Sequence, residues 1–218
     1  SQFSTLTAFK DDPWPDFQLK ILGIDPHVIP DELKKTRYAV KNISDFNRGL
    51  NKISENKSTI FIQAKTSTFL RTMPEESLSA LLGKLSAMGF TLISDDEYVI
   101  DNANKNYINL VKIICHSFDE LMGVVMSVDA VITCDTFMLH FSNAANKKTI
   151  GIFNCMSSES YTYLPYQANL IRINVDKEYI FSNKVVMSED EVKDMGKEKY
   201  FYEMWQNSVN EVINNLEL

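Results

Sequence analysis

The 218 residues carry a formal net charge of −7, and 44% of them are hydrophobic, which is enough apolar material for one substantial core with an added segment. The acidic balance argues against nucleic acid or an anionic membrane surface as the main partner, and no apolar run is long enough to span a bilayer. Three widely spaced cysteines without a CxxC pair favour free thiols in a reducing cytoplasm over a zinc site or a disulfide framework.

The first 57 residues alternate short apolar stretches with turn signals. Residues 17–22 predict a short helix that ends at Gly23. A second short helix is predicted after Ser44, which can cap its first turn. We interpret residues 1–57 as a linker or the remnant of a preceding domain.

From residue 58 onward, predicted strands and helices alternate along the chain. The strands are predicted over 59–63, 90–93, 107–110, 130–134, 149–153 and 170–174. Apolar residues at helical spacing lie between them, and a long polar loop is predicted over 154–167. This rhythm predicts an α/β fold, a Rossmann-like parallel sheet flanked by helices over residues 58–187, with residues 188–218 as a helical tail packed on it.

Capping signals place the starts of three helices. Pro74 suits a first helical position, and Ser117 with Glu120 has the spacing of a capping box. The turn Asp135-Thr136 separates the apolar run 130–134 from the next helix. In open parallel sheets, ligands bind outside the carboxyl ends of the strands, where this turn is expected.

The helix that Asp135-Thr136 opens is a candidate phosphate-binding element. Its free N–H groups and its dipole favour an anion, so Asp135 and Thr136 are candidate ligand-binding residues, although the same pair can serve only as a helix cap. His140 lies one turn further on and either faces the ligand or satisfies a buried carbonyl.

Two other strand ends carry polar residues. The loop after the strand 59–63 contains Lys65, Thr66 and Arg71, whose cations can form charge-assisted contacts with phosphates. Asp95 and Asp96 follow the strand 90–93, where carboxylates can accept hydrogen bonds from ribose or sugar hydroxyls. Solvated loop cations and a charged turn without a function are the alternative interpretations.

The order of these motifs resembles a known family. Arg71-Thr-Met-Pro74 follows the first strand, an acidic strand end comes next, and a Ser-x-x-Glu helix then leads into Val-Asp-Ala-Val-Ile-Thr-Cys-Asp-Thr-x-x-x-His. This order resembles the C-terminal, donor-binding half of the heptosyltransferase-like glycosyltransferases of family 9, which have two facing Rossmann-like domains, the GT-B fold. By this resemblance, Asp135 contacts the donor sugar and Arg71 stands where the family has a phosphate-binding Lys or Arg.

The resemblance implies a sugar transferase without a cofactor. The donor would be a nucleotide-diphosphate sugar, similar to ADP-heptose, and the acceptor a glycan or a lipid-linked, lipopolysaccharide-type molecule. The family's catalytic base comes from the N-terminal, acceptor-binding domain, so we assign no catalytic residue here. We expect a cytoplasmic protein without a divalent metal, with peripheral membrane association through that other half.

The sequence departs from the family pattern at several positions, among them Phe137, and two alternatives are open. Phe137 stands where the family has a glycine that lets the backbone approach the ligand closely, and its bulk is expected to narrow the pyrophosphate site. A non-catalytic binding or scaffold module is therefore the second hypothesis, and a sugar-nucleotide epimerase of the same two-domain architecture is the third.

Overall fold

A single parallel sheet organises the computed structural model, which describes residues 14–53, 58–154, 169–181 and 188–216. Its strand order is β3-β2-β1-β4-β5-β6, and every neighbouring pair is parallel. The strands are β1 (Thr59–Gln63), β2 (Thr91–Ser94), β3 (Leu110–Lys112), β4 (Ala130–Cys134), β5 (Thr149–Phe153) and β6 (Leu170–Asn174). The order reverses between β1 and β4, which makes their carboxyl ends the topological switch point. The predicted Rossmann-like α/β fold is confirmed.

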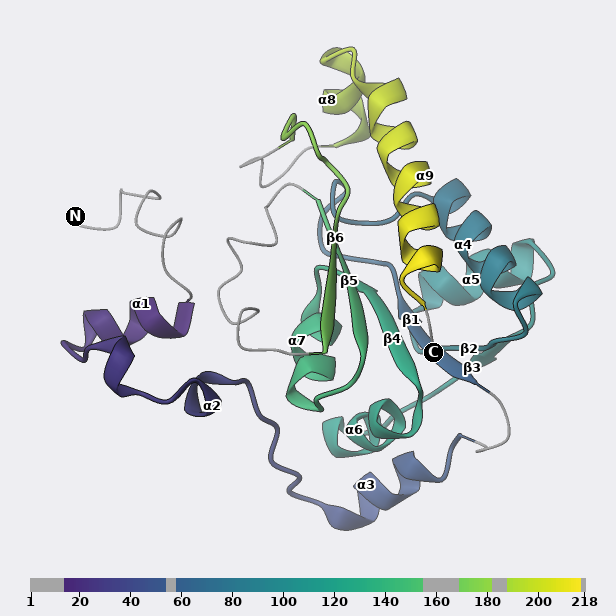
Figure 1. Cartoon of the computed structure of the whole chain (residues 1–218). Coiled ribbons are helices and arrows are strands. Elements are labelled where there is room, and N and C mark those ends of the chain that lie inside the picture. Colours follow the sequence, from purple (N-terminus) through teal and green to yellow (C-terminus); the bar gives the residue numbers. More distant parts are fainter. Residues whose placement is uncertain (1–13, 54–57, 155–168, 182–187, 217–218) are drawn as a thin grey trace.

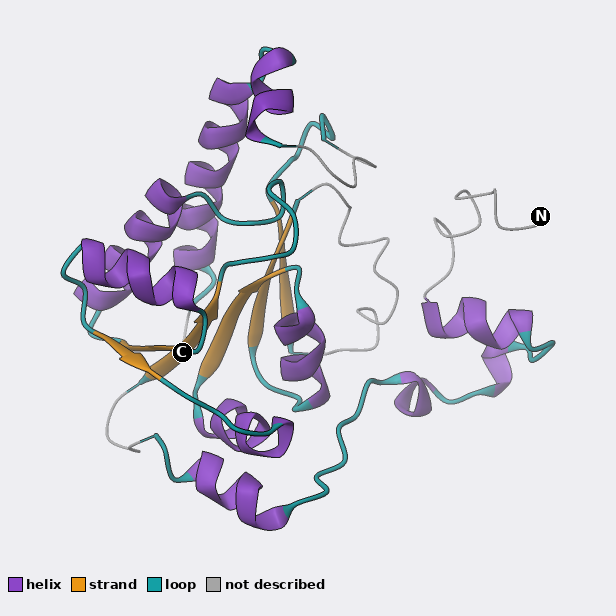
Figure 2. Cartoon of the chain, turned by 180° about the vertical axis from the view of Figure 1, so that it is seen from behind, coloured by secondary structure: helices purple, strands orange, loops and turns teal. Residues whose placement is uncertain are grey.

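Helices cover both faces of this sheet (Figures 1 and 2). One layer contains α4 (Glu75–Ala87), α5 (Glu97–Lys105), α8 (Glu189–Asp194) and α9 (Glu198–Asn214). The other contains α3 (Ile43–Leu50), α6 (Phe118–Ser127) and α7 (Phe137–Ala144). Each layer buries its own hydrophobic cluster against the sheet, so both faces of the central strands are apolar, as is typical of parallel sheets.

The side chains of β1 show how one strand serves both layers. Ile60 and Ile62 pack in the cluster under α4 and α9, whereas Phe61 packs in the cluster under α6 and α7. Each of the three is at most 1% exposed. Successive side chains of a strand point to opposite faces, so an uninterrupted apolar run is what a strand between two layers requires.

Two of the predicted helix caps differ from the structure. Asn42, and not Ser44, caps α3: its side chain accepts hydrogen bonds from the N–H groups of residues 44 and 45. The capping box of α6 is half formed, because Ser117 accepts from the N–H of Glu120 while the Glu120 carboxylate accepts from the N–H of His116. The capping box of α8, which Ser188 and Glu191 form, is complete.

Two predicted elements are displaced along the chain. Helix α1 (Trp14–Ile21) begins three residues before the predicted helix. Strand β3 begins at Leu110 and not at residue 107, because Tyr107 has a φ of 55°, a left-handed conformation that closes the end of α5 and delays the extended segment. The polar loop predicted over 154–167 lies, except for Asn154, outside the described residues.

Residues 38–53 are attached to the sheet through α6. The Tyr38 hydroxyl donates to a carboxylate oxygen of Asp119 at 2.9 Å, and helix α3 packs closely on α6 through facing glycines, Gly49 and Gly123. This segment belongs to the part of the chain that the sequence assigns to a linker. The boundary at residue 57 stays a prediction, but α3 contributes to the packing of the sheet's second layer.

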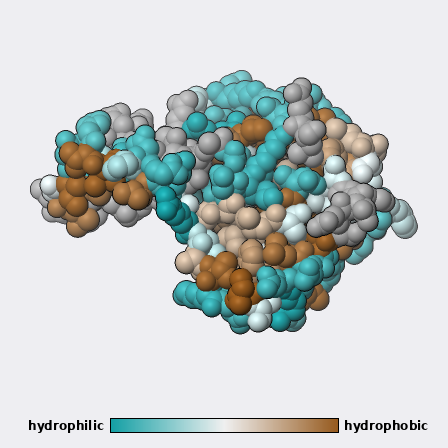
Figure 3. All heavy atoms as spheres, turned by 60° about the horizontal axis from the view of Figure 1, so that its bottom comes forward, coloured by the Kyte–Doolittle hydropathy of each residue, from teal (hydrophilic) through white to brown (hydrophobic). Residues whose placement is uncertain are grey.

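The N-terminal arm consists of α1, the 3-10 helix η3 (Pro26–Val28) and α2 (Asp31–Lys34), and it projects away from the sheet (Figures 1 and 2). Apolar residues gather on its surface (Figure 3). Among the arm residues whose side chains the structure describes, the exposed large apolar ones are Ile21, Leu22, Ile24, Val28 and Leu33. Across the described ranges, no helix combines the length and the apolar character that a bilayer crossing requires.

Candidate functional site

The candidate site lies where β1 and β4 end side by side. Thr136 caps α7: its hydroxyl oxygen accepts from the N–H of Met138 at 3.1 Å and donates to the side-chain carbonyl oxygen of Gln63 at 2.8 Å. The second bond ties the end of β4 to the end of β1. The N-terminus of α7 is thereby fixed at the switch point, with its dipole and its first amides at the carboxyl edge of the sheet.

Arg71 reaches this point from the loop after β1. One terminal nitrogen of its guanidinium lies 3.0 Å from a carboxylate oxygen of Asp135, and it also donates to the Asp135 backbone carbonyl at 3.4 Å. The carboxylate is 5% exposed and the guanidinium side chain 26% exposed, so the pair is largely shielded from water. Two of the predicted ligand residues thus contact each other across the switch point.

Hydroxyl groups of the same loop hold the guanidinium in place. Thr68 accepts from its Nε at 3.0 Å and Ser67 from its second terminal nitrogen at 3.0 Å. With the two bonds to Asp135, four of the five guanidinium donors have acceptors within the described residues. The fifth, on the nitrogen that Ser67 holds, has no acceptor among the described residues.

Thr66 forms hydrogen bonds within the loop after β1. Its hydroxyl donates to the backbone carbonyl of Thr68 at 2.8 Å, and its N–H donates to the hydroxyl oxygen of Thr72 at 3.0 Å. These bonds satisfy polar groups of a turn that sheet hydrogen bonds do not reach. In this structure Thr66 therefore shapes the loop that carries Arg71.

His140 lies half-buried one turn into α7. Burial lowers its pKa below the ordinary value, while the neighbouring Asp135 carboxylate acts in the opposite direction. The net lowering keeps the imidazole neutral at pH 7, so it can both donate and accept a hydrogen bond there.

The two aspartates after β2 have different environments. Asp96 is fully engaged by backbone amides: one carboxylate oxygen accepts from the N–H groups of Ala64 and Lys65, and the other from the N–H of Tyr98. It caps α5 and fixes the loop after β1. One oxygen of Asp95 is buried and has no hydrogen-bond partner within the described residues, and burial raises the pKa of this carboxyl.

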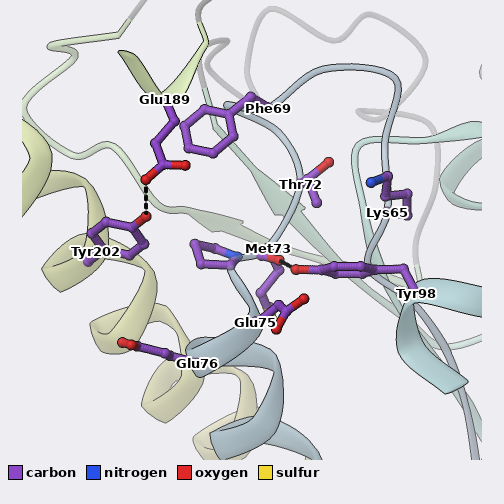
Figure 4. A pocket seen from close by; sticks show the side chains of 10 residues that line it. Lys65, Phe69, Thr72, Met73, Glu75, Glu76, Tyr98, Glu189 and Tyr202 are labelled. Atoms are coloured by element: carbon purple, nitrogen blue, oxygen red, sulfur yellow. Dashed lines mark hydrogen bonds between the residues drawn. The ribbon is translucent and has the colours of Figure 1, made fainter. Parts of the chain in front are cut away.

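Lys65 does not join Arg71. Its ammonium lies 5.1 Å from the centre of the Tyr98 ring, and its side chain lines a pocket on the α4 side of the loop together with Thr72 (Figure 4). The sequence places Lys65 and Arg71 in one loop as candidate phosphate ligands. The structure separates them, because Arg71 contacts Asp135 and does not line that pocket.

Phe137, which stands where the resemblance implies a glycine, packs sideways. Its ring lies 4.9 Å from the ring of Phe141 and 5.4 Å from that of Phe118, and 49% of the residue is exposed. The Phe137 ring, which was expected to narrow the pyrophosphate site, therefore packs against side chains of α7 and of the start of α6.

Three residues of the site were not among the predicted ligands: Gln63, Ser67 and Thr68. A polar residue that closes an apolar strand at a predicted switch point is a usable signal, and Gln63 carries it. No sequence pattern indicates that Ser67 and Thr68 hold Arg71, because that choice depends on how the loop folds. Across the described ranges, no three His, Cys, Asp or Glu side chains are grouped as metal ligands, and the expected absence of a metal stays a prediction.

Comparison with known families and structures gives a consistent result. The family model "Glycosyltransferase family 9 (heptosyltransferase)" matches residues 26–191, which confirms the family expected from the order of the motifs. Comparison with curated protein sequences gives no match.

Three solved structures share the fold. The E. coli ADP-heptose LPS heptosyltransferase II has 12% identity and a TM-score of 0.52, covering 79% of this chain and 54% of that one. E. coli heptosyltransferase WaaC with ADP has 15% identity and a TM-score of 0.51, covering 70% and 48%. The family 9 glycosyl transferase of Veillonella parvula has 12% identity and a TM-score of 0.55, covering 78% and 54%. The matched part of this chain spans about half the length of each.

Proposed function

This chain belongs to glycosyltransferase family 9 (heptosyltransferase), and from that premise we propose that it binds a nucleotide-diphosphate sugar at the carboxyl ends of β1 and β4. The observation that carries the proposal is the convergence of Arg71, Asp135 and the Thr136-capped start of α7 at the topological switch point. A cation, a sugar-binding carboxylate and a helix dipole are the groups that such a donor requires.

Each part of the donor has a proposed partner. The pyrophosphate binds at the N-terminal end of α7, where Thr136 already caps the Met138 N–H, and to the Arg71 guanidinium, which Ser67 and Thr68 hold in position. The Asp135 carboxylate, fixed by Arg71, accepts from a sugar hydroxyl, and the neutral His140 adds a second polar contact. Asp95 lies at the next strand end and has one buried carboxylate oxygen without a partner among the described residues, and we propose its carboxylate as the acceptor for a ribose hydroxyl.

The remaining predicted residues have weaker support as ligands. Asp96 and Thr66 shape the loop that carries Arg71, and Lys65 lies in the pocket on the α4 side. Their direct contact with the donor stays a prediction. One similar solved structure is described as heptosyltransferase WaaC with ADP, so an ADP-sugar is our first choice of donor.

Transfer to an acceptor is the second part of the proposal. We propose that this chain presents the donor, and that the other half of a two-domain enzyme supplies the catalytic base and binds a glycan or lipid-linked acceptor. Placing donor and acceptor in line is itself a large part of catalysis, because it replaces the entropy cost of a bimolecular encounter. The chain's own contribution would be the fixed position of the departing diphosphate.

Isothermal titration calorimetry with ADP, and with ADP-, UDP- and GDP-sugars, tests donor binding. We expect Arg71→Ala to raise the Kd of each bound nucleotide roughly tenfold to a hundredfold, the cost of losing a charge-assisted hydrogen bond. Arg37→Ala is the matched control, since Arg37 is an exposed arginine just after the N-terminal arm and donates to the Glu32 carbonyl. Circular dichroism of both variants checks that they are folded.

The same titrations separate the alternatives. Absence of binding to any of these nucleotides at millimolar concentration would overturn the proposal and favour the scaffold module, the alternative that the sequence leaves open at Phe137. An isomerised sugar nucleotide that forms without any acceptor would identify an epimerase instead.

A further inference from the structure

A pocket of about 450 Å³ lies beside the proposed donor site, on the α4 side of the loop after β1 (Figure 4). Four parts of the molecule form it: this loop, the start of α4, the start of α5, and the pair α8–α9. Arg71 and Asp135 do not line it. The pocket is therefore distinct from the pyrophosphate position, although Thr72 is the direct neighbour of Arg71.

Rings and apolar side chains form much of the wall. The Tyr98 hydroxyl donates to the Met73 carbonyl at 2.8 Å, so this tyrosine is anchored at its tip and its ring stands at the edge of the pocket (Figure 4). Phe69 stacks on Phe201 at 5.0 Å, which fixes a second ring. Rigid rings are surfaces against which the C–H faces of a ligand can pack at low entropic cost.

Carboxylates supply most of the polar wall: those of Glu75, Glu76 and Glu189. The hydroxyl of Tyr202 donates to Glu189 at 3.4 Å and orients it. The Thr72 hydroxyl already donates within its own loop. The pocket therefore offers chiefly hydrogen-bond acceptors, and a ligand must bring donors.

The charges of these carboxylates are matched by lysines. Lys105 pairs with Glu75 at 3.1 Å and Lys193 with Glu189 at 2.8 Å, both from outside the pocket wall. Lys65 supplies a third cation within the wall, above the Tyr98 ring. Two of the three carboxylates are thus paired with lysines, and Lys65 adds a third positive charge to the wall. The three carboxylates would repel a phosphate. A polycation would gain little attraction, because lysines already offset the negative charge.

We propose that this pocket binds a neutral, polyhydroxylated ligand, that is, a sugar unit. The hydroxyls of a sugar donate to Glu75, Glu76 and Glu189, and the Lys65 ammonium donates to one of its oxygens. The rings of Phe69 and Tyr98 and the side chain of Pro74 cover its apolar face. The volume suits one or two pyranose rings, within the range of small-ligand sites.

The sugar can come from two sources. It is either the glycosyl group of the proposed donor, which would then lie in this pocket in place of its proposed contact with Asp135, or a unit of a separate glycan. Binding of a free glycoside does not depend on the proposed nucleotide site. Failure of one proposal can therefore be told apart from failure of the other.

Saturation-transfer difference NMR with millimolar methyl glucoside, galactoside and mannoside tests the pocket. We expect transfer to at least one glycoside, and loss of that signal in Glu76→Ala and in Lys65→Ala, since roughly tenfold weaker binding follows from removing one charged hydrogen-bond partner. Asp101→Ala, an exposed carboxylate of α5 outside the pocket, is the matched control and should leave the signal unchanged.

The result overturns the inference if no glycoside receives saturation, if Glu76→Ala leaves the signal intact, or if spermidine displaces the glycoside. Calorimetry of Glu76→Ala then identifies the source of the sugar. If this variant binds an ADP-sugar tenfold more weakly and ADP equally well, the pocket is assigned to the donor's glycosyl group. Unchanged binding of both assigns it to a separate glycan.

Discussion

Asp135 already has a cationic partner in Arg71, and this pairing decides what a ligand gains from either residue. A diphosphate competes with the carboxylate for the guanidinium, whereas a sugar hydroxyl can use the carboxylate without breaking the pair. The 5% exposure of the carboxylate makes the competition stronger than it would be in water. The pair thus favours a ligand that carries both groups over one that carries phosphate alone.

Substitution of Asp135 tests whether the carboxylate binds the sugar hydroxyl while Arg71 binds the diphosphate. We expect Asp135→Asn to leave ADP binding unchanged or tighter, because Arg71 is released from the carboxylate, and to reduce the extra affinity of an ADP-sugar over ADP roughly tenfold. Calorimetry with both ligands measures the two effects. Asp101→Asn on the exposed surface of α5 is the control. Equal weakening of both ligands would show that Asp135 acts only by positioning Arg71.

Glu120 has a buried carboxylate that is stabilised in its charged form by three hydrogen-bond donors. Lys52 at 2.8 Å, the His116 N–H at 2.8 Å and Arg48 at 3.1 Å lower its pKa from 4.5 to about 2. Because the folded pKa lies below the unfolded one, this stabilisation is present above about pH 4.5 and is lost as the pH falls toward 2.

Chemical denaturation across pH tests the role of Glu120. We expect Glu120→Gln to lower the free energy of unfolding at pH 7 by roughly 2 kcal/mol, the cost of losing charged hydrogen bonds. The difference from the unsubstituted protein should shrink as the pH falls from about 4.5 to about 2. A difference that stays constant over this range would contradict the assignment.

At the scale of residues, the sequence locates the site but not its contacts. Asp135, Thr136 and Arg71 follow predicted strand ends, and parallel pairing brings such ends to one edge. The bond from Arg71 to Asp135 joins residues 64 positions apart, and its geometry depends on the loop between them. Asp96 could have been predicted as the cap of α5, because aspartate before a helical stretch is a common cap. Its bonds to the loop after β1 could not.

Helices α3 and α6 show how two elements approach when glycines face each other. A Cβ at Gly123 would lie 2.1 Å from the Phe46 carbonyl oxygen, and one at Gly49 would lie 1.9 Å from that of Glu120. Both neighbouring groups are backbone, which cannot move without separating the helices. The sequence predicts both helices, but the contact between them depends on residues more than 70 positions apart.

An alanine at Gly123 should therefore destabilise the protein. We expect the free energy of unfolding in urea to fall by about 2–3 kcal/mol, the range of overpacking substitutions. Gly83→Ala in α4 is the matched control, since nothing lies within 4 Å of its added Cβ, and it should raise the stability by about 0.5–1 kcal/mol. Equal effects of the two substitutions would contradict the close α3–α6 packing.

At the scale of the whole molecule, the hydrophobic pattern of the sequence predicts the fold. It does not predict where the N-terminal segment packs. Apolar strand runs alternating with amphipathic helices dictate a parallel sheet with two helical layers, as observed. Residues 38–53 carry only a short helix and turn signals, which is why they resemble a linker. Their attachment comes from single contacts, such as Tyr38 to Asp119 and Arg48 to Glu120, that no periodicity encodes.

Two shortened chains test where the folded unit begins. A chain starting at Ser58 loses α3, the Tyr38 hydrogen bond and two cationic partners of Glu120, and it uncovers the apolar cluster under α6. We expect its free energy of unfolding to fall by roughly 5 kcal/mol or more. The buried Glu120 carboxylate loses two cationic partners, and the apolar cluster under α6 becomes exposed to water.

A chain starting at Arg37 keeps all of these contacts and loses the projecting arm, whose α1 packs on η3. Its thermal and urea transitions should match those of the full chain within about 1 kcal/mol, since surface changes away from the core have small effects. If the chain from Ser58 unfolds as cooperatively and at the same midpoint as the chain from Arg37, residues 38–53 are a linker, as their composition suggests. If only the longer chain folds, the glycine-mediated packing of α3 on α6 is part of the domain that holds Arg71 and Asp135 at the switch point.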